Sequence, residues 1–337
     1  MNKENKQRLL ELDSLRGIMC LCVMIFHYTT RYQELFGHRI KYPIEFPYGK
    51  FGVQFFLITS GFLIFYIKVP QFSLKNFLFK KVIRLYPAYI VGIIITYIVL
   101  NIYPLEGRTV DLNTFLFNLT MLQGFFQVPY VDSAHWYLTV ELIFVMWSSI
   151  LLFFIKKYAN FNTDKALALI VILSIAIRLV NTFIPINRLI RLLLLTEYAP
   201  YFIIGILLSI KEKENSRFNK VIMILCMISI MMSRDIGLFV VTSIIIIIFK
   251  LMLNNKIKFI NNKVFLFIGS ISYSLYLIHQ NIGYVIINKM ENYGIFTELG
   301  LLIPALISIF LATIITYLFE KPLLKYLKKC SFIKKHY

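Results

Sequence analysis

The sequence predicts an all-α fold, a polytopic integral membrane helical bundle of about ten transmembrane helices. Hydrophobic residues make up 58% of the 337 residues and charged residues only 16%, which is more apolar than soluble domains are. The mean hydropathy is +0.72. Runs such as 89–100 and 167–177 have no polar face to present to water. We therefore expect a single domain, residues 1–337, embedded in a lipid bilayer.

Ten apolar segments are candidate spans, with boundaries uncertain by a few residues. The seventh and eighth are separated only by the short turn at 233–236, so the count depends on that turn. The expected spans are 12–30, 51–68, 83–103, 135–155, 166–184, 193–210, 219–233, 236–253, 264–288 and 299–319.

Basic residues orient the bundle, because loops that stay in the cytoplasm retain Lys and Arg. With the N-terminus inside, the other cytoplasmic segments lie around 68–84, 156–165, 211–220, 250–263 and 321–335. Together with the N-terminus they hold most of the 36 Lys and Arg residues. We therefore expect both the N- and C-termini to be cytoplasmic. The net charge of +19 does not indicate nucleic-acid binding, because the basic residues cluster between apolar spans.

Neither the N-terminus nor the cysteines predict processing or a metal site. Basic residues precede the first apolar run, as in a signal peptide, but no small-residue cleavage site follows Phe26, so we expect a retained helix. The cysteine spacing suits neither a disulfide framework nor a zinc site, and we expect no metal. The cysteines are Cys20, Cys22, Cys226 and Cys330.

Arg16 and His27 on the first span are the most informative pair, because ionisable groups inside a membrane helix are costly and mark functional sites. Their separation corresponds to about 16 Å along a helix and returns to nearly the same face. Asp13 shares that face. The alternative is structural: Asp13 caps the helix, Arg16 extends to lipid headgroups and His27 is hydrogen-bonded within the bundle.

Glu141 is the carboxylate that we place well inside a span, in the segment that follows His135 and Trp136. At the expected topology Glu141 and His27 lie at similar depth below the outer surface. A carboxylate bound to an imidazole fixes the ring's tautomer and raises its basicity. The alternative is a structural hydrogen bond between two helices.

Two further groups are candidates for ligand contact. Lys80, Lys81 and Arg84 form a basic cluster at the expected cytoplasmic surface, which is either a topology signal or, with Arg16, a grip on a phosphorylated cytosolic ligand. His279, with Gln280 beside it, is an intramembrane polar group that serves either packing or acceptor contact.

Taken together, these residues resemble the acyltransferase-3 family of bacterial integral-membrane acyltransferases over nearly the whole chain. The chain departs from the family's pattern at Gln54, where many members have Asp, and at Lys81, which replaces the first Arg of an Arg-x-x-Arg motif. The motifs are Asp13-Ser-Leu-Arg16-Gly with His27, Gly52-Val-Gln-Phe-Phe-Leu-Ile-Thr-Ser60-Gly-Phe-Leu63, Lys81-Val-Ile-Arg84-Leu-Tyr-Pro87, Trp136-Tyr-Leu-Thr-Val-Glu141, Ser272-Tyr-Ser-Leu-Tyr-Leu-Ile-His279 and Glu320-Lys-Pro322.

The resemblance implies transfer of an acetyl or other short acyl group from cytosolic acyl-CoA to a hydroxyl of a surface glycan. His27 would act as general base or be acylated itself, with Glu141 orienting it and Asp13 completing the catalytic group by ordering Arg16. The implied contacts to CoA phosphates are Arg16, Arg84, Lys81 and Lys80. The implied contacts to the acceptor are His135, Trp136, His279, Tyr273 and Gln54.

The resemblance also implies partners and a location. The expected partners are acetyl-CoA, a polysaccharide or lipid-linked glycan and the lipid bilayer, without nucleic acid; a homo-oligomer is compatible with this. The expected location is the plasma membrane of a bacterium, and we expect no appended soluble domain. The competing interpretation is a glycan transporter or flippase, but the inverted repeats and matching Gly/Pro-broken helices typical of transporters are not found in the sequence.

Overall fold

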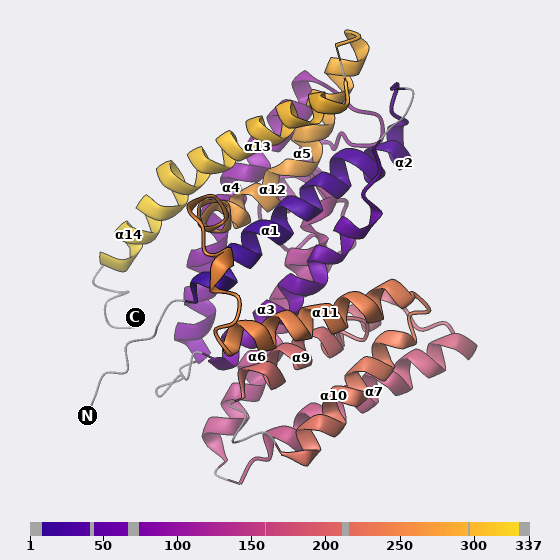
Figure 1. The fold of residues 1–337 in the computed structure, drawn as a ribbon, viewed down its shortest axis with the longest axis vertical. Helices are drawn as coiled ribbons and strands as arrows, with labels where there is room; N and C mark the ends of the chain where they lie inside the picture. Colours follow the sequence, from indigo (N-terminus) through magenta and orange to yellow (C-terminus); the bar gives the residue numbers. More distant parts are fainter. Residues whose placement is uncertain are drawn as a thin grey trace. The chain divides into compact units, whose positions relative to one another are not determined.

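The computed structural model describes residues 9–40, 44–66, 74–158, 160–210, 216–295 and 297–329, and every regular element among them is helical (Figure 1). The all-α prediction is confirmed for this part of the chain. The chain forms two compact units. Unit 1 contains residues 1–11, 53–78 and 140–259, and unit 2 contains residues 12–52, 79–139 and 260–337.

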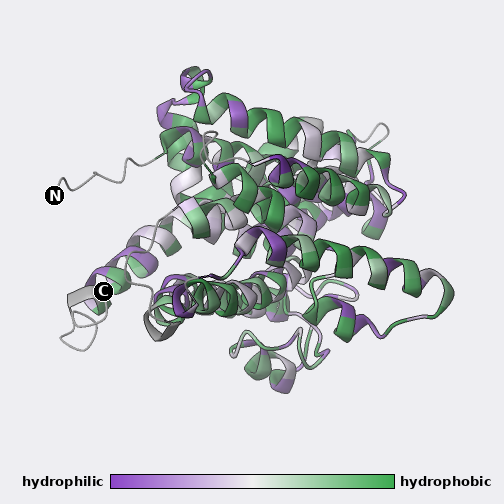
Figure 2. Cartoon of the chain, turned by 90° about the horizontal axis from the view of Figure 1, so that it is seen from below, coloured by the Kyte–Doolittle hydropathy of each residue, from purple (hydrophilic) through white to green (hydrophobic). Residues whose placement is uncertain are grey.

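Six described helical segments are long and apolar enough to cross a membrane, and Figure 2 shows apolar residues along most helices. Other predicted spans are shorter or more polar: α1 has 17 residues and α10 has 15. The chain is thus a multi-pass membrane protein, while the count of ten spans stays a prediction. The six segments are Pro47–Tyr66, Phe77–Ile102, Ser133–Lys157, Thr163–Phe183, Ile236–Leu253 and Leu299–Leu327.

Unit 2 is built around the long helix α12. The first span is a continuous helix that changes type: α1 (Leu10–Phe26) passes into the π-helical turn η1 (His27–Arg31) and then α2 (Tyr32–Phe36). The other long helices of this unit are α4 (Leu74–Ile102), α12 (Lys263–Asn292) and α13 (Leu302–Ile314), which continues through η7 (Ile315–Glu320) into α14 (Lys321–Lys329).

Contacts along α12 fix the directions of its neighbours. Arg16 of α1 reaches Ser272, and His27, further along, reaches Tyr284, so α1 runs parallel to α12. The Tyr273 hydroxyl donates to the Leu85 carbonyl near the start of α4, and Gly92 of α4 packs against Leu277 and Ile278, so α4 is parallel too. Parallel helices cross a membrane in the same sense, so these three helices agree with the expected topology, in which each starts at the cytoplasmic side.

The crossing of α1 and α12 depends on glycine. A Cβ at Gly269 would lie 2.0 Å from the carbonyl oxygen of Asp13, and one at Gly17 would lie 2.5 Å from that of Phe265. Small residues let two helix backbones approach closely within a membrane, where dispersion contacts and not hydrophobic burial drive helix association. This close approach brings the polar stripe of α1 directly onto α12.

The segment between α4 and α6, which the expected topology places on the outer side, packs into unit 2. It contains α5 (Leu112–Asn118) and η3 (Ser133–His135), which leads into α6 (Trp136–Lys157). Asn118, Gln123 and Asp132 are each fully buried. At the exposed start of α5, hydrogen bonds from the side chain and backbone of Thr114 lower the pKa of Asp111. The buried part of this segment brings polar groups against α12.

Unit 1 contains most of the remaining helices. The turn between α10 and α11 that decided the sequence-based count is present: Arg234 has φ +59°, and Asp235 caps α11 by accepting the N–H of Gly237. The helices are α3 (Gly52–Tyr66), most of α6, α7 (Thr163–Phe183), α8 (Arg188–Leu193), α9 (Ala199–Ser209), α10 (Arg217–Met231) and α11 (Ile236–Leu253), followed by the turn η5 (Lys258–Ile260) at the boundary between the units.

The span expected at 193–210 is interrupted near its start, because the helix is broken between α8 and α9. Leu195 has φ +52° in the break, and Pro200 stands at the start of α9. The freed carbonyls are satisfied from α7: Arg178 donates to those of Thr196 and Glu197 at 3.3 and 3.2 Å. A helix can break inside a membrane where other groups satisfy its backbone.

Candidate functional site

Arg16 begins the polar stripe of α1, and its guanidinium is held by neighbours on two helices. Nη2 donates to the Ser272 hydroxyl of α12 at 3.2 Å, and Nη1 lies 3.6 Å from the Asp13 carboxylate. The Arg16 and Asp13 side chains are 20% and 18% exposed. The structure therefore brings Asp13 and Arg16 together as predicted.

A second cation stands near Arg16. Arg84 of α4 is exposed, and its charge acts on Arg16. The structure adds a carboxylate that was given no role in the predicted site. Glu320 of η7 interacts electrostatically with both arginines and with Lys321. Glu320 also accepts a hydrogen bond from the Ser274 hydroxyl at 3.2 Å. This end of unit 2 is thus rich in positive charge, with Glu320 and Asp13 as its anions.

Lys80 and Lys81 lie on α4 about one turn before Arg84, and both are half-buried. Tyr273, predicted to contact the acceptor, lies beside the first half of α4, where its hydroxyl donates to the Leu85 carbonyl at 2.9 Å. The contact of Tyr273 with the acceptor stays a prediction.

His27 lies at the other end of the stripe. Its Nδ1 is 3.0 Å from the hydroxyl of Tyr284 on α12, and its ring centroid is 5.0 Å from that of His279. Arg108 lies over the Tyr284 ring at 5.6 Å. Arg16 and His27 therefore both face α12, which confirms that they share one face of the first helix.

His279 is held in one tautomer. Its Nδ1 faces two backbone carbonyls, those of Tyr276 at 2.9 Å and Leu275 at 3.2 Å. Carbonyls only accept, so Nδ1 carries the proton and Nε2 presents a lone pair. Nε2 is buried and has no hydrogen-bond partner among the described residues. The ring therefore offers an unused acceptor beside His27.

His135 repeats this arrangement. Its Nε2 lies 2.8 Å from the Leu277 carbonyl, so Nε2 carries the proton, and its buried Nδ1 has no partner among the described residues. The amide oxygen of Asn281 is likewise unused, while its nitrogen donates to the Val131 carbonyl at 2.9 Å. Buried polar groups are normally paired. Unused acceptors in this part of unit 2 suit a ligand that donates hydrogen bonds.

Asp132 supports this histidine-rich region. One carboxylate oxygen accepts the N–H of Ala134 at 2.9 Å and the other accepts that of Asn281 at 3.0 Å, so Asp132 ties the turn before α6 to α12. The Gln280 amide donates to the Ser133 hydroxyl at 2.8 Å. These bonds place His135 against α12. Sequence reasoning missed Asp132 and Tyr284 because neither belongs to a motif used there.

Other predicted residues lie apart from these contacts. Glu141 of α6 is 7% exposed and Gln54 of α3 has a buried amide oxygen without a partner in the described chain, and both belong to unit 1. Trp136 starts α6 in unit 2 and packs edge-on to Tyr137. The pairing of Glu141 with His27 stays a prediction. Glu141 is not the only buried carboxylate among the described residues. Glu291 of α12, taken as a whole residue, is also 7% exposed.

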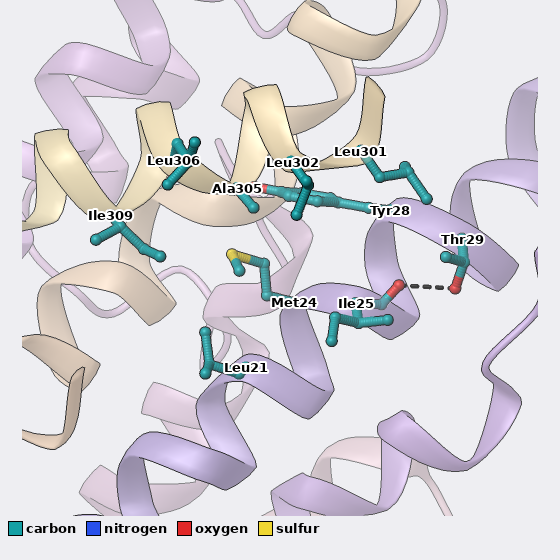
Figure 3. A pocket seen from close by; sticks show the side chains of 10 residues that line it. All are labelled: Leu21, Met24, Ile25, Tyr28, Thr29, Leu301, Leu302, Ala305, Leu306 and Ile309. Atoms are coloured by element: carbon teal, nitrogen blue, oxygen red, sulfur yellow. Dashed lines mark hydrogen bonds between the residues drawn. The ribbon is translucent and has the colours of Figure 1, made fainter. Parts of the chain in front are cut away.

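An apolar groove of about 260 Å³ opens between the first helix and α13 (Figure 3). Tyr28 and Leu302 face one another across it, and its other lining residues are almost all aliphatic. Such a lining offers a sugar few hydrogen bonds. The polar contacts of His27 therefore lie on the side of η1 that faces α12 and not in this groove. Within the described residues no group of His, Cys, Asp or Glu could hold a metal ion.

The fold and this geometry define a multi-pass membrane protein with a cationic end and a buried imidazole centre joined by one helix. The chain belongs to the acyltransferase-3 family: the family model described as an acyltransferase domain matches residues 9–321. The protein is therefore an acyltransferase, and family membership favours the enzyme over the transporter. Comparisons with curated proteins and with solved structures gave no match.

Proposed function

We propose that the protein moves an acetyl group from cytosolic acetyl-CoA to a hydroxyl of a cell-surface or lipid-linked polysaccharide at the bacterial plasma membrane. The proposal rests on the observation that Arg16 and His27 lie on one helix and both face α12. Their separation of about 16 Å is comparable to the reach of a pantetheine arm. CoA phosphates bound at Arg16 would thus place the thioester near His27.

The cationic end supports the donor site. Arg16 and Arg84, with Lys80 and Lys81, offer charge-assisted hydrogen bonds to phosphate oxygens. Asp13 orders Arg16 through the contact at 3.6 Å. Because Arg84 is exposed, CoA phosphates reach it without crossing the apolar interior.

In the proposed reaction His27 takes the proton of the acceptor hydroxyl, and the hydroxyl oxygen attacks the thioester carbonyl. The new C–O bond forms, the C–S bond breaks, and the proton returns from His27 to the CoA thiolate. In the second route His27 attacks the thioester carbonyl, the C–S bond breaks and the CoA thiolate leaves. The acceptor oxygen then attacks the acyl group on His27, the C–N bond breaks, and the hydroxyl proton passes to the thiolate. Glu141 would orient His27 in either route.

The acceptor would bind at the unused lone pairs. His279 Nε2 and His135 Nδ1 can each accept a hydrogen bond from a hydroxyl, as a polyol requires. Trp136, beside His135, would supply an aromatic face to the sugar. We propose Gln54 as a further contact to the acceptor.

The test is release of CoA thiol from acetyl-CoA by detergent-solubilised protein, with acceptor supplied as membrane-extracted glycan. Acceptor-dependent thiol release with acetyl appearing on the glycan supports the proposal. Succinyl-CoA in a parallel reaction identifies the acyl group. Thiol release only with another acyl-CoA would overturn the acetyl donor, and release unaffected by glycan would overturn the acceptor.

Arg84→Ala and Arg16→Ala should raise the KM for acetyl-CoA by about 10-fold or more, with a smaller effect on kcat, because each removes a charged contact to phosphate. The wild-type KM should also rise with ionic strength, since an exposed cationic site is screened. Arg188→Ala, which removes an arginine placed in an expected outer loop, is the control. Unchanged acetyl-CoA affinity in both variants, measured by calorimetry, would place the donor site elsewhere.

Ten spans with cytoplasmic termini predict which loops face outward. In a background without native cysteines, Glu106→Cys should react with an impermeant thiol reagent in intact cells, and Lys256→Cys should not. Both native side chains are exposed, so burial does not decide the result. Labelling at 256 from outside would reverse the assigned faces in that half of the chain.

A further inference from the structure

A buried histidine–carboxylate pair near His27 has no role in the mechanism above. His38, in the loop after α2, places Nδ1 2.8 Å from Oε1 of Glu291 on α12, and each side chain is only 2% exposed. The Tyr32 hydroxyl donates to the other carboxylate oxygen at 3.1 Å, and the backbone N–H of Arg39 approaches Oε1 at 3.4 Å. Glu291 is thus surrounded by donors, which suits its ionised form.

The second ring nitrogen of His38 also faces an acceptor. Nε2 lies 3.0 Å from the backbone carbonyl of Tyr28. A carboxylate and a carbonyl both accept, so both contacts are hydrogen bonds only when each ring nitrogen carries a proton. The arrangement is therefore that of an imidazolium paired with a carboxylate and shielded from water. Removing one member of such a pair leaves an uncompensated buried charge.

The carbonyl that His38 holds belongs to the residue directly after His27. Both lie in the π-helical turn η1, and such turns occur often at functional sites. The Tyr28 hydroxyl donates to the His279 carbonyl at 2.9 Å, and its ring passes so close to Gly283 that a Cβ there would lie 2.1 Å away. The backbone of Tyr28 is held by His38 and its ring by α12.

An aromatic contact gives a second connection to His27. The Tyr32 ring lies 4.6 Å from the His38 ring and 5.6 Å from that of Tyr284, centroid to centroid. Tyr284 in turn makes the hydrogen bond to His27 Nδ1. A shift of His38 would therefore reach His27 through both the backbone of η1 and this hydroxyl.

We propose that His38 and Glu291 form a charged clamp that positions His27, so that acyl transfer requires His38 as the imidazolium as long as residue 291 is a carboxylate. The inference rests on the proposed role of His27 as the base. Groups facing His38 include Glu291 from α12 and Tyr32 from α2, while η1 contributes the Tyr28 carbonyl; Arg39 of the same loop approaches Glu291 through its backbone N–H. His38 is a positioning residue, because it acts through the turn that carries His27.

The clamp predicts a bell-shaped dependence of kcat on pH. Activity rises with pH as His27 becomes able to accept a proton, and falls once one ring nitrogen of His38 lacks its proton, because a lone pair would then face the Glu291 carboxylate or the Tyr28 carbonyl. In Glu291→Gln the amide can donate to a neutral His38, whose Nε2 still donates to Tyr28. This variant should keep kcat within about 3-fold of wild type and lose the alkaline limb.

His38→Gln should behave differently, because it leaves the Glu291 charge buried without its partner. Its kcat should fall by about 10-fold or more, while the KM for acetyl-CoA stays within about 2-fold, since Arg16 and Arg84 are untouched. The double variant His38→Gln with Glu291→Gln should recover part of the loss, because no lone charge remains. A fall in kcat that equals or exceeds the product of the two single effects would contradict the pairing.

The experiment measures kcat and KM between about pH 5 and pH 10 for the full-length wild type and the three variants, with thermal unfolding as the check on folding. Loss of the alkaline limb in Glu291→Gln supports the clamp. Its persistence there, or wild-type kcat in His38→Gln, overturns it.

A second readout separates failure of the clamp from failure of the proposed function. The rate at which diethyl pyrocarbonate modifies His27, followed by mass spectrometry, requires no turnover. At each pH, comparison with Glu291→Gln removes the effect of titrating His27 itself. The ratio of the wild-type rate to the Glu291→Gln rate should change across the pH series. If the wild type transfers no acyl group but this ratio changes, the proposed function fails and the clamp stands; a constant ratio overturns the clamp.

Discussion

His27→Ala should lower kcat for acyl transfer by about 100-fold or more, because a general base contributes at least that factor. The protein should remain folded in the membrane, since the ring makes one side-chain hydrogen bond, to the Tyr284 hydroxyl at 3.0 Å. The measurement is acetyl transfer to glycan at saturating acetyl-CoA, with acetyl-CoA binding as the control for the intact donor end.

Tyr284→Phe is the graded companion of this variant. It removes the hydroxyl at Nδ1 but leaves the ring of His27 in place, so its loss of kcat should be smaller, about 10-fold. His336→Ala is a second control, because that histidine lies outside the described residues and outside every motif. More than about a tenth of wild-type activity in His27→Ala would exclude the ring as base or acyl carrier.

Much of the helix layout could be predicted because hydropathy and caps are local. The expected span 236–253 coincides with α11, and 166–184 nearly coincides with α7, whose cap Asn162 stands just before it. The break in 193–210 could not be predicted, because the donor that makes it tolerable, Arg178, belongs to another helix.

The site was predictable along one helix and not between helices. Spacing alone placed Arg16 and His27 on one face, and the contacts to Ser272 and Tyr284 confirm it. The identity of the facing helix could not be inferred, since α12 lies far along the chain. His38 was not predicted because it lies in a loop outside the apolar runs, and its contacts to Glu291 and to the Tyr28 carbonyl form only in the folded chain.

Gly269→Ala should strongly destabilise the protein and lower its Tm in detergent by more than about 5 °C. The new methyl group would lie 2.0 Å from the Asp13 carbonyl oxygen, which is backbone and cannot move aside. The crossing of α1 and α12 must therefore open, and the Arg16–Ser272 contact at 3.2 Å would open with it. Alanine's higher helix propensity, worth about 1 kcal/mol, cannot offset this loss of packing.

Gly92→Ala is the matched control for this prediction. Both glycines lie inside long helices, so the gain in helix propensity is the same. A Cβ at Gly92 would meet only side chains, with the Cβ of Leu277 at 3.3 Å, and these can yield slightly. We expect Gly92→Ala to stay within about 1 kcal/mol of wild type. Equal Tm for the two variants would show that the spacing of α1 and α12 is not set at Gly269, and the stripe from Arg16 to His27 would then need another source of support.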